Sequence, residues 1–195
     1  MRIVGLTGTR GSGKDAVASF MTMLHGYTRV AFADRLKEAA SLVYGLSHEQ
    51  VHGSLAAKEE VDPRWGLSPR FILQQLGTEV GRSIHPDTWI RSLLDVDIPA
   101  RESAGASPTG WVVADVRFPN EAAAIRERGG CIVRVVRPGW DLGGAAAQHA
   151  SEVELAAIAE DFVIENSGTL EDLGNQTQLL IRKLKENPRG MVTRH

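Results

Sequence analysis

The segment GTRGSGK at residues 8–14 restricts the fold of this chain more than any other feature of its sequence. It matches the pattern G-x-x-x-x-G-K, in which glycines let the backbone curl around phosphate groups and the lysine reaches their oxygens. Residues 2–6 form an apolar run that predicts a buried strand, and residues 14–24 carry apolar side chains at helical spacing. The sequence therefore predicts a strand, a phosphate-binding loop and a helix in direct succession.

We expect this loop to bind a nucleoside triphosphate. Successive backbone N–H groups point at the phosphates, the helix N-terminus adds its partial positive charge, and Lys14 reaches the β and γ oxygens. A chance glycine-rich turn is the alternative, but it does not explain a lysine placed between a strand and a helix. The loop residues expected to hold the triphosphate are Gly8, Thr9, Arg10, Gly11, Ser12, Gly13, Lys14 and Asp15.

Two aspartates are predicted to hold Mg²⁺. Asp15 stands where the common motif has a Ser or Thr whose hydroxyl ligates the metal, and its carboxylate can bind the same hard cation directly or through water. Asp115 closes the apolar segment WVVAD, where enzymes with this loop place an acidic residue to orient the metal. For Asp115, a plain strand-ending aspartate is the alternative.

Arg117 follows Asp115 at the predicted carboxyl edge of a sheet, where the ligands of α/β proteins bind. A guanidinium there can clamp a phosphate with two hydrogen bonds, although a surface arginine would give the same pattern. The predicted catalytic residues are therefore Lys14, Asp15, Asp115 and Arg117.

Strand and helix signals alternate along the chain. Near-continuously apolar segments at 27–33, 111–116, 131–137 and 161–166 predict strands that are buried on both faces of a parallel sheet. Helices are predicted at 34–43, with Asp34 as cap, at 119–129, at about 148–160, and after Thr169 as cap. Residues 47–97 read as mostly helical, with Ser68 capping a helix, and residues 99–110 as an exposed loop. We expect a single α/β domain of residues 1–195, with its core at 1–44 and 111–188 and a helical insertion at about 45–98.

Composition limits the class of protein. The formal net charge of −2 favours a small anionic ligand over stable nucleic-acid binding. The one cysteine, Cys131, excludes an intramolecular disulfide and a thiolate cluster for zinc or iron–sulfur binding, and it begins an apolar strand as inert core. No segment approaches the roughly 20 apolar residues that span a bilayer. A cytoplasmic protein without membrane association is the expectation.

The helical block carries a polar stripe. Gln74, Thr78 and Arg82 recur at intervals of four beside the apolar stripe at 72, 76 and 80. A solvated face is one reading. The functional reading is that Gln74, Gln75 and Thr78 bind a nucleobase edge, because discrimination among bases needs such polar groups, while nearby arginines bind a phosphate.

Two further segments have open readings. The triplet Asn166-Ser167-Gly168 follows the last predicted strand and is expected beside the adenine of the donor, although a capping turn would look similar. The trio at 149, 151 and 152 (His, Ser, Glu) forms no hydrolytic constellation that the sequence can demonstrate.

Five motifs together resemble one family. They are SGKD at 12–15, LQQLGT at 73–78 with Trp89 downstream, DVR at 115–117, VVRPG at 135–139, and DFVI at 161–164 leading to Asn166 and Gly168. On these residues the chain resembles the bacteriophage-type deoxynucleoside monophosphate kinases of the P-loop kinase superfamily over nearly its whole length. An aspartate after the loop lysine is normal in that family.

The resemblance implies a P-loop kinase-like three-layer sandwich with a five-stranded parallel sheet. It also implies phosphoryl transfer from ATP with Mg²⁺ to a deoxynucleoside monophosphate that the helical block holds, and, for a phage protein, a location in the host cytoplasm. Lys14, the metal and one or more of Arg10, Arg117 and Arg137 are expected to neutralise the developing charge. The segment DVRFP is similar to the DGFPR of adenylate-kinase-like enzymes, with the arginine displaced.

The expected contacts divide into two groups. Donor contacts beyond the loop are Arg137, Asn166, Ser167 and Gly168. Acceptor contacts are Lys37, Arg64, Arg70, Gln74, Gln75, Thr78, Arg82, Trp89 and Arg117. Residues 138–148 stand where such kinases carry an arginine-rich lid, but they contain no arginine, so closure is expected to use Arg137, His149 or other helices.

Alternative functions remain at this stage. One is a P-loop kinase of another small phosphorylated metabolite, phosphomevalonate-like or dephospho-CoA-like, since the loop alone does not separate these acceptors. Another is a non-catalytic nucleotide-binding regulatory module, against which the intact Lys14, Asp15 and Asp115 argue. A homodimer is left open.

Overall fold

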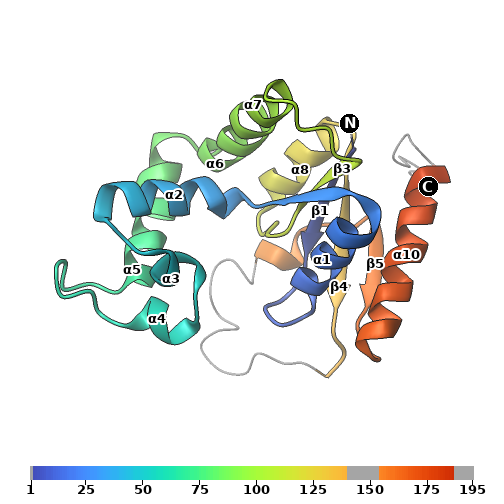
Figure 1. Ribbon diagram of the computed structural model, residues 1–195, viewed down its shortest axis with the longest axis horizontal. Helices are drawn as coiled ribbons and strands as arrows, with labels where there is room; N and C mark the ends of the chain where they lie inside the picture. The colour runs from blue at the N-terminus through green and yellow to red at the C-terminus, as the bar shows by residue number, and fades with distance from the viewer. Residues whose placement is uncertain (1, 140–153, 187–195) are drawn as a thin grey trace. The chain divides into compact units, whose positions relative to one another are not determined.

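The computed structural model describes residues 2–139 and 154–186 (Figure 1). The chain separates into two compact units, which we call unit 1 (Met1–Ala31 with Ala106–His195) and unit 2 (Phe32–Gly105). Unit 1 contains the sheet and unit 2 is built from helices. Within the described parts of the chain, no helix combines the length and the apolar character needed to cross a membrane.

Unit 1 is built on a five-stranded parallel sheet with the strand order β2-β3-β1-β4-β5. Its strands are β1 (Arg2–Thr7), β2 (Tyr27–Val30), β3 (Gly110–Val113), β4 (Cys131–Val136) and β5 (Phe162–Glu165). Val4 of β1 lies opposite Val112 of β3 on one side and Cys131 of β4 on the other. The predicted parallel sheet is confirmed, and β1 lies at the point where the strand order reverses.

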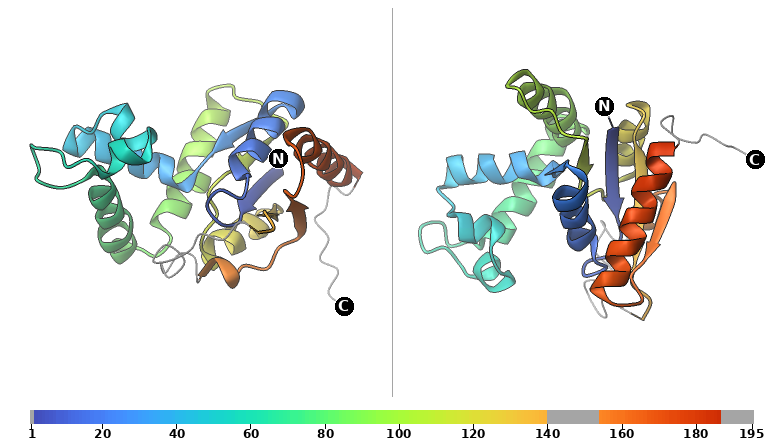
Figure 2. Two further views of the ribbon diagram at one scale, coloured as in Figure 1. Left: turned by 90° about the horizontal axis from the view of Figure 1, so that it is seen from below. Right: turned by 45° about the vertical axis from the view of Figure 1, so that its right-hand side comes forward.

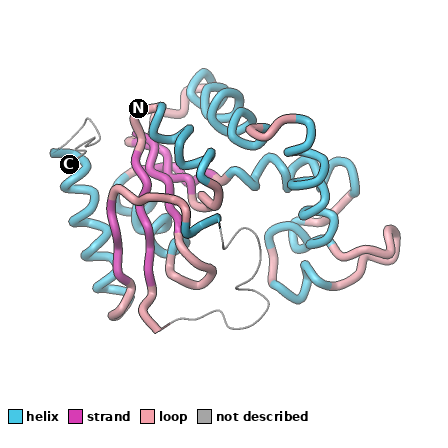
Figure 3. The backbone as a smooth tube through the Cα atoms, turned by 180° about the vertical axis from the view of Figure 1, so that it is seen from behind, coloured by secondary structure: helices cyan, strands magenta, loops and turns pink. Residues whose placement is uncertain are grey.

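Helices cover both faces of this sheet, as Figures 2 and 3 show for the strands of unit 1. On one face, α1 (Lys14–His25) and α10 (Leu170–Glu186) bury apolar side chains such as Met21 and Leu180 against Leu6. On the other face, Ile125 of α8 (Pro119–Glu127) packs over Gly5. Adjacent strand residues point to opposite faces, so Gly5 and Leu6 contact different layers. The three-layer sandwich follows.

The strand ends correct the sequence prediction. β2 ends at Val30 and the helix α2 (Phe32–Tyr44) begins at Phe32, so the predicted strand 27–33 is too long and the cap at Asp34 is wrong. The register explains this, because Val30 pairs with Val113, the last residue of β3. For the same reason β3 is shorter than the predicted 111–116.

Helix starts that depend on local capping were predicted better. Ser68 caps the helix at 69–74 by accepting a 3.2 Å hydrogen bond from the N–H of Phe71. Thr169 and Asp172 exchange hydrogen bonds at the start of α10, and the Thr169 side chain holds the pKa of Asp172 below its usual value. Of the predicted helix at about 148–160, residues 154–160 are described; residues 154–156 are helical, and residues 157–160 form a turn and a loop, so the predicted helix extends too far at its C-terminal end.

The described residues of unit 2 are helical, as predicted, apart from turns and one isolated bridge between Asp62 and Leu67. The segments after α2 are α3 (His48–His52), α4 (Leu55–Glu59), α5 (Pro69–Gln74), η1 (Gln75–Arg82), α6 (Thr88–Arg91), η2 (Ser92–Asp97) and α7 (Ile98–Ser103). Helix α7 occupies part of the predicted loop at 99–110. Ile98 is buried there and Arg101 bonds Asp97 one turn back, which supports the helix.

The π-helical segments η1 and η2 were not expected from the sequence. Their wider turns change which side chains face inward. In η1, Val80 of the predicted apolar stripe is 47% exposed, while Gly77 and Gly81 are buried. The side chains of Leu36 and Trp89 fill the space beside these two glycines.

Candidate functional site

The polar residues of unit 1 gather at the carboxyl ends of its strands. The phosphate loop follows β1, Asp115 follows β3, Arg137 follows β4 and Asn166 follows β5. The carboxyl ends of parallel strands share one edge of the sheet, and ligands bind in the crevice where the strand order reverses. The structure thus brings these sequence-predicted residues to one edge around the central strand β1.

The loop is tightly curled at its glycines. Gly8 and Gly13 have φ angles of 138° and 108°, a region that side chains disfavour. A Cβ atom on Gly8 would lie 2.3 Å from the carbonyl oxygen of Val135, and one on Gly13 would lie 2.6 Å from Nδ2 of Asn166. Both positions therefore need glycine for backbone angle and for space.

Two hydroxyl groups are buried in or next to the loop. The Thr7 and Ser12 side chains are fully buried, and Oγ1 of Thr7 and Oγ of Ser12 have no hydrogen-bond partner among the described residues. An unpaired buried hydroxyl is costly, so such groups are expected where a bound ligand or water supplies the partner. The loop fits an oxygen-rich anion such as a phosphate.

Lys14 begins α1 and folds its side chain back over the loop. Its ammonium Nζ donates to the carbonyl oxygens of Gly8 at 2.6 Å and of Thr9 at 2.7 Å. These bonds hold a positive charge at the N-terminal end of a 12-residue helix, where the helix dipole also favours anions. The arrangement is suited to binding phosphate oxygens.

Asp15 projects from the first turn of α1 and its carboxylate is 88% exposed. Oδ1 accepts a 3.2 Å hydrogen bond from Nη2 of Arg29 on β2. An exposed pair of this kind stabilises the fold little, so the carboxylate stays accessible to another cation. Sequence reasoning missed Arg29; the available signal was a lone arginine within an apolar strand.

The turn after β3 is fixed by a buried carboxylate. Oε2 of Glu121, which is 2% exposed, accepts from the backbone N–H groups of Arg117 at 2.8 Å and Phe118 at 3.1 Å. The Arg117 side chain is exposed and Asp115 is partly buried. Glu121 was also missed, although a glutamate in the first turn after Pro119 is a common helix-start signal.

The sequence predicts that Asp15 and Asp115 hold Mg²⁺. No group of three or more His, Cys, Asp or Glu side chains with metal-ligand geometry exists within residues 2–139 and 154–186. Mg²⁺ is usually bound by one or two carboxylates together with substrate phosphates and water, so a dedicated protein cage is not required. The two carboxylates fit that mode of binding.

Asn166 joins the end of β5 to the loop. Its Nδ2 donates to the carbonyl oxygen of Ser12 at 2.9 Å, and its backbone N–H donates to the carbonyl oxygen of Val136 at 2.7 Å. Ser167, Gly168 and Arg137 are exposed at the same edge. His149, the trio at 149–152 and most of the predicted lid at 138–148 lie outside the described residues.

The predicted acceptor residues, apart from Arg117, belong to unit 2. Gln74 and Thr78 are exposed, and Arg70 pairs with Glu59 at 3.0 Å on the surface. Trp89 donates from Nε1 to the Gly77 carbonyl oxygen at 2.8 Å, which ties α6 to η1. The remaining predicted contacts, partly buried except for Arg64, are Lys37, Arg64, Gln75 and Arg82.

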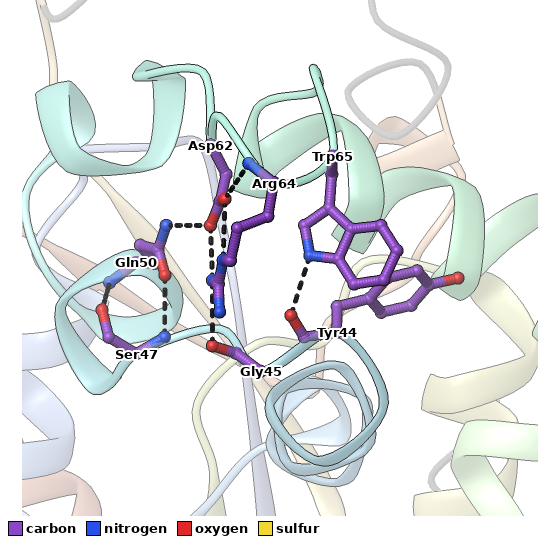
Figure 4. A network of polar contacts seen from close by, with 7 residues as sticks. All are labelled: Tyr44, Gly45, Ser47, Gln50, Asp62, Arg64 and Trp65. Carbon is purple, nitrogen blue, oxygen red and sulfur yellow. Dashed lines mark hydrogen bonds and ion pairs between the residues drawn. The ribbon is translucent and has the colours of Figure 1, made fainter.

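Arg64 is bound within a network around the buried carboxylate of Asp62 (Figure 4). Its Nε and Nη2 donate to the two Asp62 oxygens at 2.9 and 2.6 Å, and Nη2 also donates to the Gly45 carbonyl. Gln50 donates to Asp62 at 2.9 Å. The Arg64 hydrogen bond, followed by that of Gln50, holds the pKa of Asp62 well below its usual range. Asp62 was missed, although an aspartate two residues before its partner is typical of turns.

Comparison with known proteins identifies relatives. The family model described as deoxynucleotide monophosphate kinase matches residues 56–177. A relative from Acanthamoeba polyphaga mimivirus, whose name assigns it to that family, is 36% identical and covers 90% of this chain and 94% of its own length. The deoxynucleotide monophosphate kinase of Enterobacteria phage T4 is 28% identical and covers 64% of this chain; the match spans about half (48%) of that relative.

Two solved structures share the fold. A dephospho-CoA kinase from Campylobacter jejuni superposes with a TM-score of 0.53 over 96% of this chain and 100% of its own, at 17% identity. A sugar kinase from Janibacter sp. HTCC2649 gives a TM-score of 0.51 over 93% of this chain and 95% of its own, also at 17% identity. At this identity the likeness shows the P-loop kinase fold alone.

Proposed function

This chain belongs to the deoxynucleotide monophosphate kinase family, and on that premise we propose that it transfers the γ-phosphoryl group of ATP to a deoxynucleoside monophosphate. The observation that carries the proposal is the glycine loop of unit 1, which places the Lys14 ammonium over a curled backbone at the start of α1. The products are ADP and a deoxynucleoside diphosphate.

The donor triphosphate lies in the loop under this proposal. Backbone N–H groups of residues 8–15 surround its phosphates. The Lys14 ammonium, which donates to the Gly8 and Thr9 carbonyl oxygens in the structure, donates instead to β and γ phosphate oxygens. Asn166, Ser167 and Gly168 at the end of β5 flank the adenine. The orphaned hydroxyls of Thr7 and Ser12 support an oxygen-rich ligand at this place.

The reaction is an in-line displacement. An anionic oxygen of the acceptor phosphate attacks the γ phosphorus, and the bond from that phosphorus to the β–γ bridging oxygen breaks, which releases ADP. No general base is required, because the attacking oxygen carries no proton. Positioning and charge neutralisation supply most of the catalysis.

Positive groups offset the charge that develops during transfer. Lys14 is one, and we assign the same role to Arg10, Arg117 and Arg137. Glu121 fixes the backbone of Arg117 and therefore limits where its guanidinium can reach. Asp15 and Asp115 hold Mg²⁺, which when bound neutralises phosphate oxygens of the donor.

We assign the acceptor to unit 2. Gln74, Gln75 and Thr78 supply the hydrogen-bonding groups that discriminate among bases. Lys37, Arg64, Arg70 and Arg82 supply positive charge for the monophosphate, while Trp89 holds η1 in shape. The Arg70–Glu59 pair is exposed and weak, so a phosphate can compete for Arg70.

We further propose that the protein acts in the cytoplasm, that of the host if a phage encodes it, and that it forms no stable complex with nucleic acid. The net charge of −2 supports a small anionic substrate over a polyanion.

A coupled ADP-release assay tests the proposed function. The full-length chain is incubated with ATP and Mg²⁺ and each of the four deoxynucleoside monophosphates, then with dephospho-CoA and with phosphomevalonate. ADP release that depends on one or more of the deoxynucleoside monophosphates is expected. Release with only another acceptor, or no release above the acceptor-free rate, would contradict the proposal.

A further inference from the structure

Trp65 combines a bonded polar edge with a ring that is only partly covered. Nε1 donates to the carbonyl oxygen of Tyr44 at 2.9 Å. The Tyr44 and Trp65 rings meet edge to face, with centroids 5.3 Å apart and planes 77° apart. The side chain of Trp65 nevertheless remains 45% exposed. The indole is fixed in one orientation and presents an apolar π surface to its surroundings.

The other described tryptophans are used for packing. Trp111 is fully buried in β3, and Trp89 is partly buried against Gly81 with its N–H bonded to Gly77. In contrast, nearly half of Trp65 remains exposed, so packing within the fold does not account for the whole side chain. A rigid exposed aromatic ring suits ligand binding, because no side-chain entropy is lost when a ligand covers it.

The residue before Trp65 in the sequence, Arg64, carries a cation that is held in place. The Arg64 guanidinium is held by both carboxylate oxygens of Asp62 and by the Gly45 carbonyl, yet its side chain is about half exposed. Figure 4 shows the Arg64 and Trp65 side chains extending from the same loop alongside each other. A flat π surface with a neighbouring cation complements a molecule that has a planar ring and an anionic group.

Asp62 organises both side chains. Besides binding the guanidinium, its backbone carbonyl accepts from the N–H groups of Trp65 at 3.1 Å and Gly66 at 2.9 Å. The backbone N–H of Asp62 donates to the carbonyl oxygen of Leu67 at 3.0 Å, which closes the loop at residues 62–67. The buried carboxylate and the backbone of one residue therefore set the positions of the ring and of the cation.

We propose that Trp65 stacks on the base of the acceptor nucleotide, and that Asp62 is the positioning residue that holds Trp65 and Arg64 for it. This inference rests on the proposed function and names the part of the acceptor site that grips the base. Stacking is tolerant of base identity because every base has a π face. Trp65 therefore contributes affinity for all four bases, while the polar groups of α5 and η1 discriminate among them.

The experiment compares the full-length wild type with Trp65→Ala, Trp65→Phe and a matched control, Phe71→Ala. Phe71 is an aromatic residue of nearly equal exposure, 46%, on α5 of the same unit. KM for each of the four acceptors and for ATP is measured after circular dichroism has confirmed folding. We expect Trp65→Ala to raise every acceptor KM by about 5- to 150-fold without changing their ranking, since loss of one stacked base has this effect on affinity.

The expected pattern has three further parts: ATP KM stays constant, Trp65→Phe restores most of the acceptor affinity, and Phe71→Ala behaves as the wild type. An unchanged acceptor KM in Trp65→Ala would overturn the proposal. So would an equal rise in the KM of ATP, which would place Trp65 at the donor or indicate a general structural defect.

A binding measurement separates this inference from the proposed function. A deoxynucleoside monophosphate is titrated without ATP into the wild type and into Trp65→Phe, and tryptophan emission is recorded. Quenching in the wild type that is lost in Trp65→Phe supports stacking even if no turnover is found. Identical emission changes in both proteins would overturn stacking even if the wild type is an active kinase.

Asp62→Asn tests the positioning role. The amide cannot accept from both donor groups of Arg64, so Arg64 and Trp65 lose their fixed arrangement. We expect a raised acceptor KM with kcat and ATP KM retained, measured below the melting temperature of the variant. A parallel loss of kcat, acceptor affinity and ATP affinity would show a merely structural role and contradict the assignment.

Discussion

The side-chain amide of Asn166 donates a 2.9 Å hydrogen bond to the main-chain carbonyl of Ser12, 154 residues earlier in the chain. This bond ties the end of β5 to the phosphate loop at the position where Gly13 leaves no room for a side chain. The shape of the loop therefore depends on a residue that directly follows β5, the last strand in the sequence.

Replacing Asn166 by Ala is expected to weaken ATP binding about 2- to 12-fold, the range for loss of one neutral hydrogen bond. Asn166→Asp is expected to be worse, because a carboxylate would face the Ser12 carbonyl. Calorimetric titration with a non-hydrolysable ATP analogue measures the effect, and Asn175→Ala, an exposed asparagine on α10, is the control. Wild-type affinity in both Asn166 variants would show that the loop holds its shape without this bond.

Asp15→Ala is expected to lower Mg²⁺ affinity more than ATP affinity. The backbone loop persists in this variant while a charged ligand on the metal side is lost. The rate is titrated with Mg²⁺ at saturating ATP, with Glu127→Ala, an exposed carboxylate on α8, as the control. An unchanged half-saturating Mg²⁺ concentration would mean that Asp15 is only a residue favoured at a helix start.

Gln74→Leu is expected to change the relative kcat/KM among nucleoside monophosphates by about 1–3 kcal/mol, because a polar group of the base loses its partner. ATP affinity should stay the same. Trp65→Ala offers a contrast, since it should lower kcat/KM for all acceptors by a similar factor. If Gln74→Leu keeps the wild-type ranking and loses ATP affinity instead, the division into donor and acceptor units is wrong.

The Asp62 network should make stability depend on pH in the acid range. Because hydrogen bonds from Arg64 and Gln50 depress the folded-state pKa of Asp62, its contribution is fully present above the unfolded pKa of about 3.9 and is lost as pH falls toward the folded value. The melting temperatures of wild type and Asp62→Asn should therefore differ most near neutral pH and converge below about pH 4. A difference that stays constant as the pH is lowered well below about 4 would exclude ionised Asp62 as the cause.

Much of unit 1 could be predicted from the sequence because its three inner strands, β1, β3 and β4, are largely buried on both faces and read as continuous apolar runs. The edge strands β2 and β5 were predicted to be buried on both faces as well, but they expose Arg29 and Val163. The phosphate loop could be predicted because its glycines and Lys14 have a fixed spacing. Cys131 is buried, as expected from its place in an apolar strand, and burial raises the pKa of its thiol to about 12. Local capping at Ser68 and Thr169 followed from the residues themselves.

The features that sequence reasoning missed depend on contacts between distant segments. Strand ends were set by register, so β2 stops where its partner β3 stops. Arg29 reaches Asp15 from another element, and Asp62 gains its partners only when its loop closes. The π turn of η1 places Gly77 and Gly81 against Leu36 and Trp89. The regular helical spacing used for the sequence prediction does not indicate this packing.

Lys14→Ala tests the central claim most directly, because we assign the binding of phosphate oxygens to Lys14 and its side chain contributes little to the apolar core. Circular dichroism and kinetics are measured on the same preparation with a deoxynucleoside monophosphate that the wild type accepts. The account predicts a folded protein whose kcat is lower by at least about 100-fold, as for loss of one charge-stabilising group in a preorganised site. A folded Lys14→Ala variant with the kcat of the wild type would contradict it.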